Sequence, residues 1–140
     1  MKMNKICNIG LIVVISLFYL PFAHANNSPF VGTWQLVSGE YINDKKELIS
    51  YESLGISSQK VINEHYFSFV SMANGTFWAA GSGKYTFTDT EYIESPNVAS
   101  YPLEDGGNYS FTYRFEGKLW HNARWHGETR VEYEVWKKID

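Results

Sequence analysis

The sequence predicts an all-β protein whose short antiparallel strands close into an up-and-down β-barrel of about eight to nine strands. Two runs of aromatic and β-branched residues flank Asn74-Gly75, a pair that favours the positive φ angles of a hairpin turn. Strict alternation follows over residues 109–116, with aromatic residues on one face and polar residues on the other. Closure into a barrel would leave no exposed sheet edge. A two-sheet β-sandwich is the alternative.

Residues 1–25 have the pattern of a secretory signal peptide. Lys2 and Lys5 precede an apolar run, and Ala23-His24-Ala25 has the small-x-small pattern of a cleavage site. The alternative is a retained membrane anchor, but the apolar run is shorter than the ~20 residues that a spanning helix needs. We therefore expect export to the periplasm or the extracellular space, with cleavage after the last alanine of this motif.

The mature chain would have 115 residues and no cysteine, because Cys7 leaves with the signal peptide. The fold would then depend on its apolar core, for which 21 aromatic residues are available. Loss of Lys2 and Lys5 leaves 10 basic and 15 acidic residues, a formal net charge of −5. This balance argues against nucleic acid and anionic membrane surfaces as partners.

The predicted strands of the mature chain are separated by turn residues at hairpin spacing. Along the chain they cover 30–42, 47–51, 60–72, the later part of a meander over 65–94, 109–116, 118–125 and 128–139. Residues 53–58 are expected to form a loop or one helical turn, and 95–107 the longest connection, a loop at the barrel rim. Gly81-Ser82-Gly83 lies inside a strand pattern, where glycine marks a bulge, a barrel corner or the close approach of another group.

Five short motifs follow one another along the mature chain. They are Gly32-Thr33-Trp34-Gln35-Leu36, His65-Tyr66-Phe67, Gly81-Ser82-Gly83-Lys84-Tyr85, Tyr92-Ile93-Glu94 and Glu134-Val135-Trp136-Lys137-Lys138. In these motifs the chain resembles the small bacterial secreted lipocalin-like β-barrel domains, and its Gly-x-Trp resembles the opening of lipocalin barrels. The resemblance implies a calycin-type barrel over residues 26–140. The chain departs from the family pattern at Lys137-Lys138, where arginine is common. The fold hosts carriers, enzymes and inhibitors, so the resemblance implies little about the ligand.

Three polar residues, His65, Glu94 and Glu134, lie on separate predicted strands, each in a row of apolar residues. If these rows face inward, the three side chains could form an acid/base site, a ligand anchor or a metal site. The simplest satisfied arrangement has one carboxylate holding His65, with Tyr85 or Tyr92 as a further donor. The alternative is a purely structural hydrogen-bond network at a barrel end, or exposure to solvent.

No metal, cofactor or catalytic residue is assigned from the sequence. His121 and His126 are five residues apart, which places them on opposite faces of a strand, and the mature chain has no cysteine ligand. Gly81-Ser82-Gly83 lacks the Gly-x-Ser-x-Gly pattern of a nucleophilic serine, and no predicted helix follows it to complete a dinucleotide-binding fingerprint.

The aromatic row is core by default, but an eight-stranded barrel can also hold one small ligand. The abundance of tyrosine favours a pocket, because buried phenolic hydroxyls need partners. We predict a secreted protein that binds a small apolar or amphipathic molecule inside the barrel. The candidate ligand-binding residues are His65, Phe67, Phe69, Trp78, Tyr85, Tyr92, Glu94, Phe111, Tyr113, Glu134 and Trp136.

Two other functional classes stay open at this point. A cofactor-free barrel enzyme, of isomerase or cyclase type, would need His65 or a carboxylate facing the cavity with a shifted pKa. An envelope inhibitor or interaction module would instead use the rim loop 95–107, with Tyr101, Pro102 and Leu103 exposed. Trp34 is predicted to be a fold anchor at the closed end of the barrel and not a ligand contact.

Overall fold

The structure, a computed structural model, describes residues 28–103 and 107–140, which consist almost entirely of antiparallel β-sheet. The elements are β1 (Gly32–Ile42), β2 (Leu48–Ser50), the 3₁₀-helix η1 (Glu52–Leu54), β3 (Ile56–Ile62), β4 (Tyr66–Ala73), β5 (Thr76–Phe87), β6 (Glu91–Ala99), β7 (Tyr109–Glu116), β8 (Leu119–His126) and β9 (Thr129–Lys138). The predicted signal peptide lies outside the described residues. Among the described residues, no helix has the length and hydrophobicity to span a membrane.

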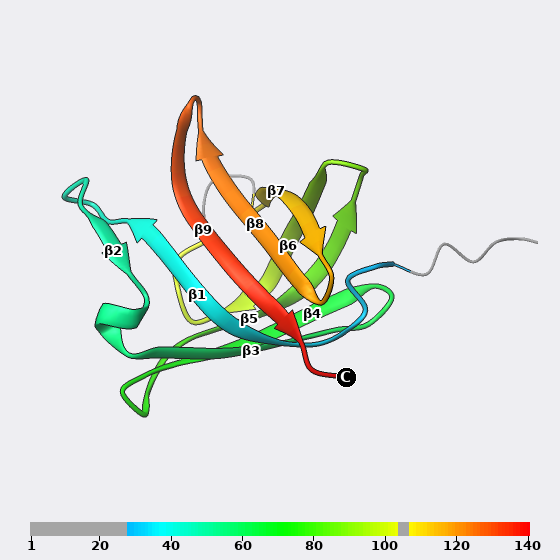
Figure 1. Cartoon of the computed structure of the whole chain (residues 1–140), viewed down its shortest axis with the longest axis horizontal. Helices are drawn as coiled ribbons and strands as arrows, with labels where there is room; N and C mark the ends of the chain where they lie inside the picture. Colours follow the sequence, from blue (N-terminus) through cyan, green and yellow to red (C-terminus); the bar gives the residue numbers. More distant parts are fainter. Residues whose placement is uncertain (1–27, 104–106) are drawn as a thin grey trace, which may run out of the picture.

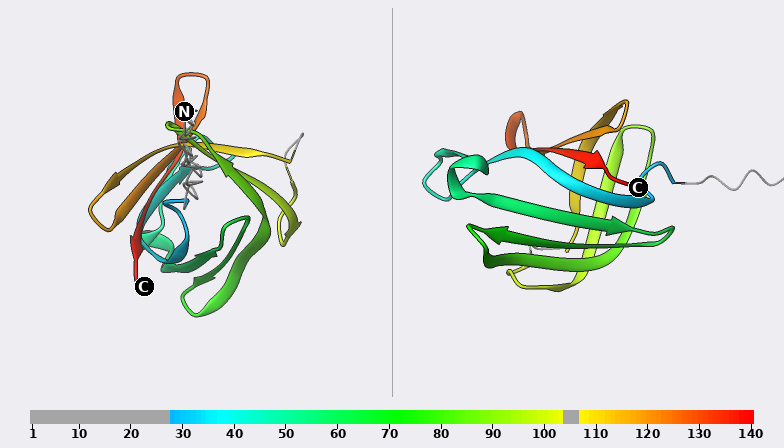
Figure 2. Two further views of the ribbon diagram at one scale, coloured as in Figure 1. Left: turned by 90° about the vertical axis from the view of Figure 1, so that its right-hand side faces the viewer. Right: turned by 60° about the horizontal axis from the view of Figure 1, so that its bottom comes forward.

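Eight strands form a closed up-and-down barrel (Figures 1 and 2). Strands β3 to β9 pair with their neighbours in chain order, β3 pairs with β1, and β9 pairs back onto β1 from Trp34↔Lys138 to Tyr41↔Glu132. Strand β2 is additional to this ring and pairs with the end of β1. The predicted barrel is thus confirmed, and the β-sandwich alternative is wrong.

The first turn of the meander forms where the sequence predicts it. Asn74 and Gly75, with φ of 49° and 78°, make the β4–β5 hairpin. The next reversal is closed by Thr88, whose side-chain oxygen accepts from the backbone N–H groups of Thr90 and Glu91. A β-bulge between Ser82 and Gly83 interrupts the β5–β6 ladder, as the glycine pair indicated.

The predicted strand over 60–72 is wrong, because a turn divides it into β3 and β4. The Asn63 side chain causes the break: its Oδ1 accepts from the backbone N–H groups of His65 and Tyr66 at 2.9 and 2.8 Å. This turn places His65 outside the strands, in an exposed position. The predicted rim loop over 95–107 is also too long, since β6 continues to Ala99 in register with β5.

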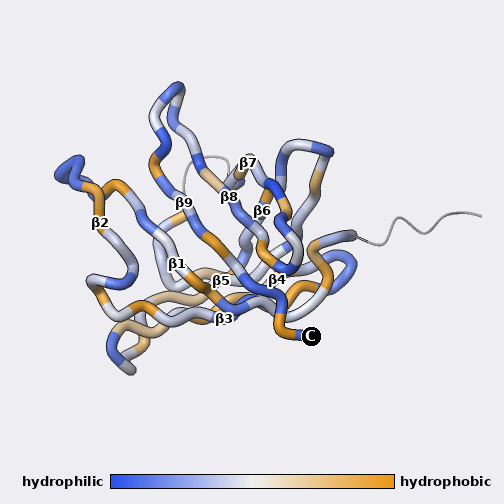
Figure 3. The backbone as a smooth tube through the Cα atoms, in the orientation of Figure 1, coloured by the Kyte–Doolittle hydropathy of each residue, from blue (hydrophilic) through white to orange (hydrophobic). Residues whose placement is uncertain are grey.

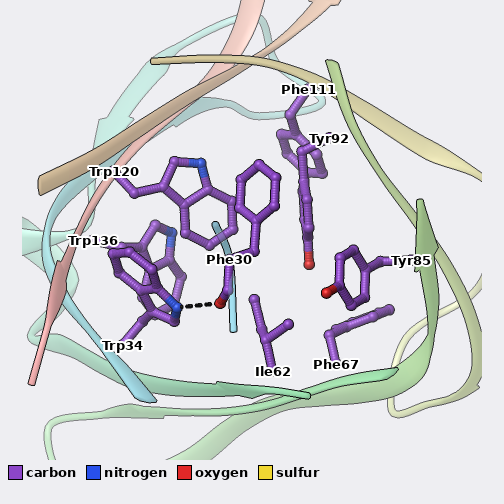
Figure 4. Packing of buried hydrophobic residues seen from close by; sticks show 9 residues of the cluster. All are labelled: Phe30, Trp34, Ile62, Phe67, Tyr85, Tyr92, Phe111, Trp120 and Trp136. Carbon is purple, nitrogen blue, oxygen red and sulfur yellow. Dashed lines mark hydrogen bonds between the residues drawn. The ribbon is translucent and has the colours of Figure 1, made fainter. Parts of the chain in front are cut away.

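One end of the barrel is filled by aromatic side chains (Figure 4). Phe30, in the segment that precedes β1, is fully buried and lies at the centre of this cluster, with Trp34, Tyr92 and Trp120 around it. The indole Nε1 of Trp34 donates to the carbonyl oxygen of Phe30 at 2.8 Å. Trp34 is only 2% exposed, which confirms its buried position. We call this the filled end.

Apolar and polar residues interleave along the strands instead of gathering in one segment (Figure 3). Strand β7 shows the pattern most clearly: Phe111 is buried, whereas its neighbours Ser110 and Thr112 are exposed. Side chains of alternate residues point to opposite faces of a strand, so each strand supplies one inward row and one outward row. These inward rows define the barrel interior described below.

Candidate ligand-binding cavity

The half of the barrel opposite the filled end contains a cavity of about 370 Å³. We call this half the cavity end; it carries the β4–β5 and β8–β9 turns and the connection between β6 and β7. The cavity reaches the surface beside Trp78, which is 38% exposed, and the exposed Pro102. Its lining residues are Leu36, Tyr41, Tyr51, Ile56, Ser58, Lys60, Phe69, Ser71, Trp78, Ala79, Glu94, Tyr101, Pro102, Tyr109, Phe111, Arg124, Glu132, Glu134 and Trp136.

At the cavity end, Gly39 and Gly81 have no side chain and so leave room for the rings of Tyr51 and Tyr101. A Cβ atom on Gly39 would lie 2.3 Å from the ring of Tyr51. A Cβ on Gly81 would lie 2.7 Å from the ring of Phe69 and 2.9 Å from the hydroxyl of Tyr101. Side chains at these two glycines would collide with the aromatic walls. The close approach that the sequence indicated at Gly81 is therefore confirmed.

A buried ion pair forms the inner boundary of the cavity. Lys60 on β3 and Glu94 on β6 face each other across the barrel, with Nζ and Oε1 2.6 Å apart and side chains only 4% and 7% exposed. Aromatic rings surround the ammonium group; their centroids lie 4.9–5.9 Å from Nζ, with Trp136 at 4.9 Å and Trp120 at 5.3 Å. The ion pair and these cation–π contacts offset the cost of burying the Lys60 ammonium group.

A second polar chain runs along the β8–β9 wall. The indole Nε1 of Trp136 donates to Glu134 Oε2 at 2.8 Å. The Tyr51 hydroxyl lies 3.0 Å from Glu132 Oε1 and 3.3 Å from Glu134 Oε1. Arg124 Nε donates to Glu132 Oε2 at 2.9 Å. Two carboxylates thus share one tyrosine hydroxyl, whose single proton can serve only one of them.

The electrostatics of this chain favour a proton on Glu134. Burial, and next the charge of Glu132, raise the pKa of Glu134 to about 7, although the positive charge of Lys60 opposes the rise. Burial and the two carboxylates also raise the pKa of Tyr51, which stays neutral. Glu134 can therefore exchange a proton near neutral pH inside a largely aromatic cavity.

The structure brings six of the predicted ligand-binding residues together around the cavity: Phe69, Trp78, Glu94, Phe111, Glu134 and Trp136. Three others belong to the filled end, where Phe67, Tyr85 and Tyr92 are part of the packed cluster. Tyr113 packs against the same cluster and donates to the carbonyl of Thr88. These four side chains therefore do not line the cavity.

His65 is a correction to the predicted trio. It is exposed in the β3–β4 turn, so it does not meet Glu94 and Glu134 inside the barrel. Lys60, and not His65, is the basic side chain that a carboxylate holds inside the barrel. The predicted convergence of the two carboxylates on one interior is confirmed, and their role in binding stays a prediction.

Sequence reasoning missed Lys60, Tyr51, Glu132 and Arg124. Two of them carried a usable signal in the period of two. Lys60 lies on the same face of β3 as Ile62, and Glu132 lies on the same face of β9 as Glu134 and Trp136. Tyr51 gave no such signal, because it lies between β2 and η1 and enters the barrel only through tertiary packing.

Among residues 28–103 and 107–140, no group of three or more histidine, cysteine or acidic side chains is arranged to hold a metal ion. His121 bonds through Nδ1 to the Tyr133 hydroxyl at 2.7 Å, and His126 is exposed at the end of β8. The two histidines point to different surroundings and form no joint site.

No family model and no curated protein matches the chain. Among solved structures it is similar to an uncharacterized protein from Bacteroides eggerthii, with 18% sequence identity and a TM-score of 0.49. The match covers 78% of this chain and 98% of that chain. The likeness carries no argument about function.

Proposed function

We propose that this protein binds a small amphipathic molecule in the cavity end of the barrel, as a lipocalin-like carrier or binding protein. The observation that carries the proposal is the cavity of about 370 Å³, with aromatic walls and a few convergent polar groups. Ligand pockets have this composition and fall in the range of ~300–1,000 Å³. A barrel filled throughout would instead have favoured the alternative of an interaction module that acts through its rim loop.

The polar groups suggest how such a ligand would lie. Its polar end would reach the inner boundary, where Lys60, Glu94 and Glu134 meet. Its apolar body would contact Phe69 and Trp136 and extend toward the opening. The ion pair fixes polar groups that need no rearrangement on binding, which limits the entropic cost of recognition.

A matched pair of substitutions on β5 tests the binding function. Ala79 lines the cavity, whereas Ala80 pairs with Val70, which is 45% exposed, on the outer face. Ala79→Phe should fill the cavity and abolish binding of Nile red, a neutral apolar dye, while Ala80→Phe should bind it like the parent. Mass spectrometry of the purified parent should also find a co-purifying small molecule that Ala79→Phe lacks. Equal dye binding by both variants would contradict the proposal.

A proton-transfer enzyme is the second candidate, and the position of Glu134 favours it. A carboxyl group with a pKa of about 7 in an apolar cavity is suited to general acid/base catalysis at neutral pH. The two functions separate in one variant, because Glu134→Gln keeps the shape of the side chain but cannot exchange a proton. An enzyme would retain ligand binding and lose turnover, whereas a carrier would show no turnover of its bound molecule in either form.

We further propose export to the periplasm or the extracellular space. Residues 1–25 support this through their basic start, apolar run and small-x-small motif. N-terminal sequencing of the mature protein from the envelope or medium should begin at Asn26 or within one or two residues of it. Folded protein with Met1 intact in the cytoplasm would contradict export.

A further inference from the structure

The charged groups in the described part of the cavity lining do not balance. Its described lining contains two cations, Lys60 and Arg124, and three carboxyl groups, Glu94, Glu132 and Glu134. Lys60 is paired with Glu94 and Arg124 with Glu132. Among the described residues, Glu134 has no cationic partner within ion-pair distance.

The hydrogen bonds leave Glu134 incompletely satisfied as well. Its Oε2 accepts from the Trp136 indole, but its Oε1 shares the single proton of Tyr51 with the closer Glu132 Oε1. An ionised carboxylate has room for about four donors. Ionised Glu134 therefore has acceptor capacity that a donor in the cavity would fill.

A second buried polar side chain, which does not itself line the cavity, lies on the neighbouring strand. Asn122 on β8 is directly opposite Glu134 in the β8–β9 register and is only 1% exposed. Neither its Oδ1 nor its Nδ2 has a hydrogen-bond partner among the described residues. Buried side-chain amides are normally bonded, so Asn122 adds unfilled hydrogen-bonding capacity next to Glu134.

The walls also favour positive charge. The face of an aromatic ring is negative and attracts cations, an effect that Lys60 already uses over Trp136. An anionic ligand would meet three carboxyl groups, and the nearest ammonium, on Lys60, is already paired with Glu94. An anion would therefore lose its hydration, and each cation of the described lining is already paired with a carboxylate.

Building on the proposed binding function, we propose that the ligand is an amphipathic amine, whose protonated nitrogen pairs with Glu134 inside the aromatic cavity, and that the cavity discriminates against carboxylates. The amine supplies the missing positive charge and N–H donors for Glu134. The charge balance of the cavity, not its apolar walls, would then determine which amphipathic molecules bind.

Three probes with a common phenylalkyl body test this inference: 4-phenylbutylamine, 4-phenylbutanol and 4-phenylbutanoate. Isothermal titration calorimetry at pH 8 should rank the amine at least about tenfold above the alcohol, because a hydrogen bond to a charged group contributes about one factor of ten or more. The carboxylate should bind more weakly than the alcohol.

Glu134→Gln should reduce the amine-to-alcohol affinity ratio to about one. The matched control is Glu64→Gln, which makes the same chemical change in the exposed β3–β4 turn and should keep the ratio of the parent. An amine that binds no better than the alcohol, or a carboxylate that binds best, would overturn the amine inference and leave the binding function intact. Binding of none of the three at millimolar concentration, together with no Nile red binding, would overturn both.

A pH series on the unsubstituted protein tests the same point without a variant. The amine stays protonated below pH 9, so its affinity should fall by at least about tenfold from pH 8 to pH 5 as Glu134, with a pKa of about 7, takes up a proton. Amine binding at pH 7 should release about half a proton, seen by titration in buffers of different ionisation enthalpy. An amine affinity that does not fall toward pH 5 would overturn the inference.

The titratable and charged groups around Glu134 in this interpretation are Glu132, Lys60, Glu94, Tyr51 and Arg124.

Discussion

At the filled end of the barrel Phe30 contacts six aromatic rings with centroids 4.6–6.3 Å away. At the cavity end, inward positions are occupied by small residues such as Gly39, Ala79 and Gly81. The same strands pass through both ends, so strand number alone does not determine whether a barrel is hollow. A plugging segment fills one end, whereas at the other end Gly39 and Gly81 leave room for aromatic rings along the cavity wall.

The Lys60–Glu94 ion pair lies at the boundary between the two ends. On one side its aromatic neighbours belong to the packed core, and on the other both side chains line the cavity. A buried ion pair is not required for stability, because apolar residues of similar size often stabilise a core equally well. Its position therefore suits recognition at the cavity end more than support of the filled end.

The largest difference between the two ends is expected from tryptophan removal. Trp34→Ala empties a fully packed site at the filled end and should lower the free energy of unfolding by ~3–5 kcal/mol. Trp78→Ala removes a ring that is 38% exposed at the opening and should cost less than about 1 kcal/mol while weakening ligand binding. Urea unfolding of the two variants compares them, and similar losses would mean that the ends are equally packed.

Separating the boundary pair should have a comparable or slightly smaller effect. Lys60→Met leaves Glu94 buried without a counter-ion and should destabilise the protein by ~3–5 kcal/mol, whereas Lys60→Met combined with Glu94→Leu should recover most of the loss. The control is Arg130→Ala, which breaks a more exposed pair with Glu40 and should cost at most about 1 kcal/mol. A double variant as unstable as the single one would show that the pair itself stabilises the core.

The smallest expected effect is the pH dependence that Glu134 gives to the cavity end. Its pKa rises from 4.5 to about 7 on folding, so between these values the folded state binds more protons than the unfolded chain. The contribution of Glu134 to stability is therefore complete below pH 4.5 and falls as pH rises to about 7, by on the order of 2–3 kcal/mol. Glu134→Gln removes this loss, so its stability relative to the parent should be higher at pH 8 than at pH 5. Denaturant unfolding at both values checks the prediction, and an unchanged difference would contradict it.

The all-β barrel, most strand positions and the hairpin turn at Asn74-Gly75 were predictable from the sequence, because alternation and turn residues act over a few neighbours. Asn74-Gly75 and the aromatic row of β7 are examples of such local signals. The break at Asn63 was missed because one side chain overrode a run of good strand formers.

The sequence also determined that Glu94, Glu134 and Trp136 share strand faces with apolar residues, since a period of two places alternate residues on one face. The structure decided that these faces point inward. Only the tertiary structure decided which inward residues are core and which line a cavity. That division depends on the height of each residue along the barrel axis, on the position of Phe30, and on the entry of Tyr51 from outside the ring. These are contacts between distant residues, such as Tyr51 and Glu134, which are 83 positions apart, and no local pattern encodes them.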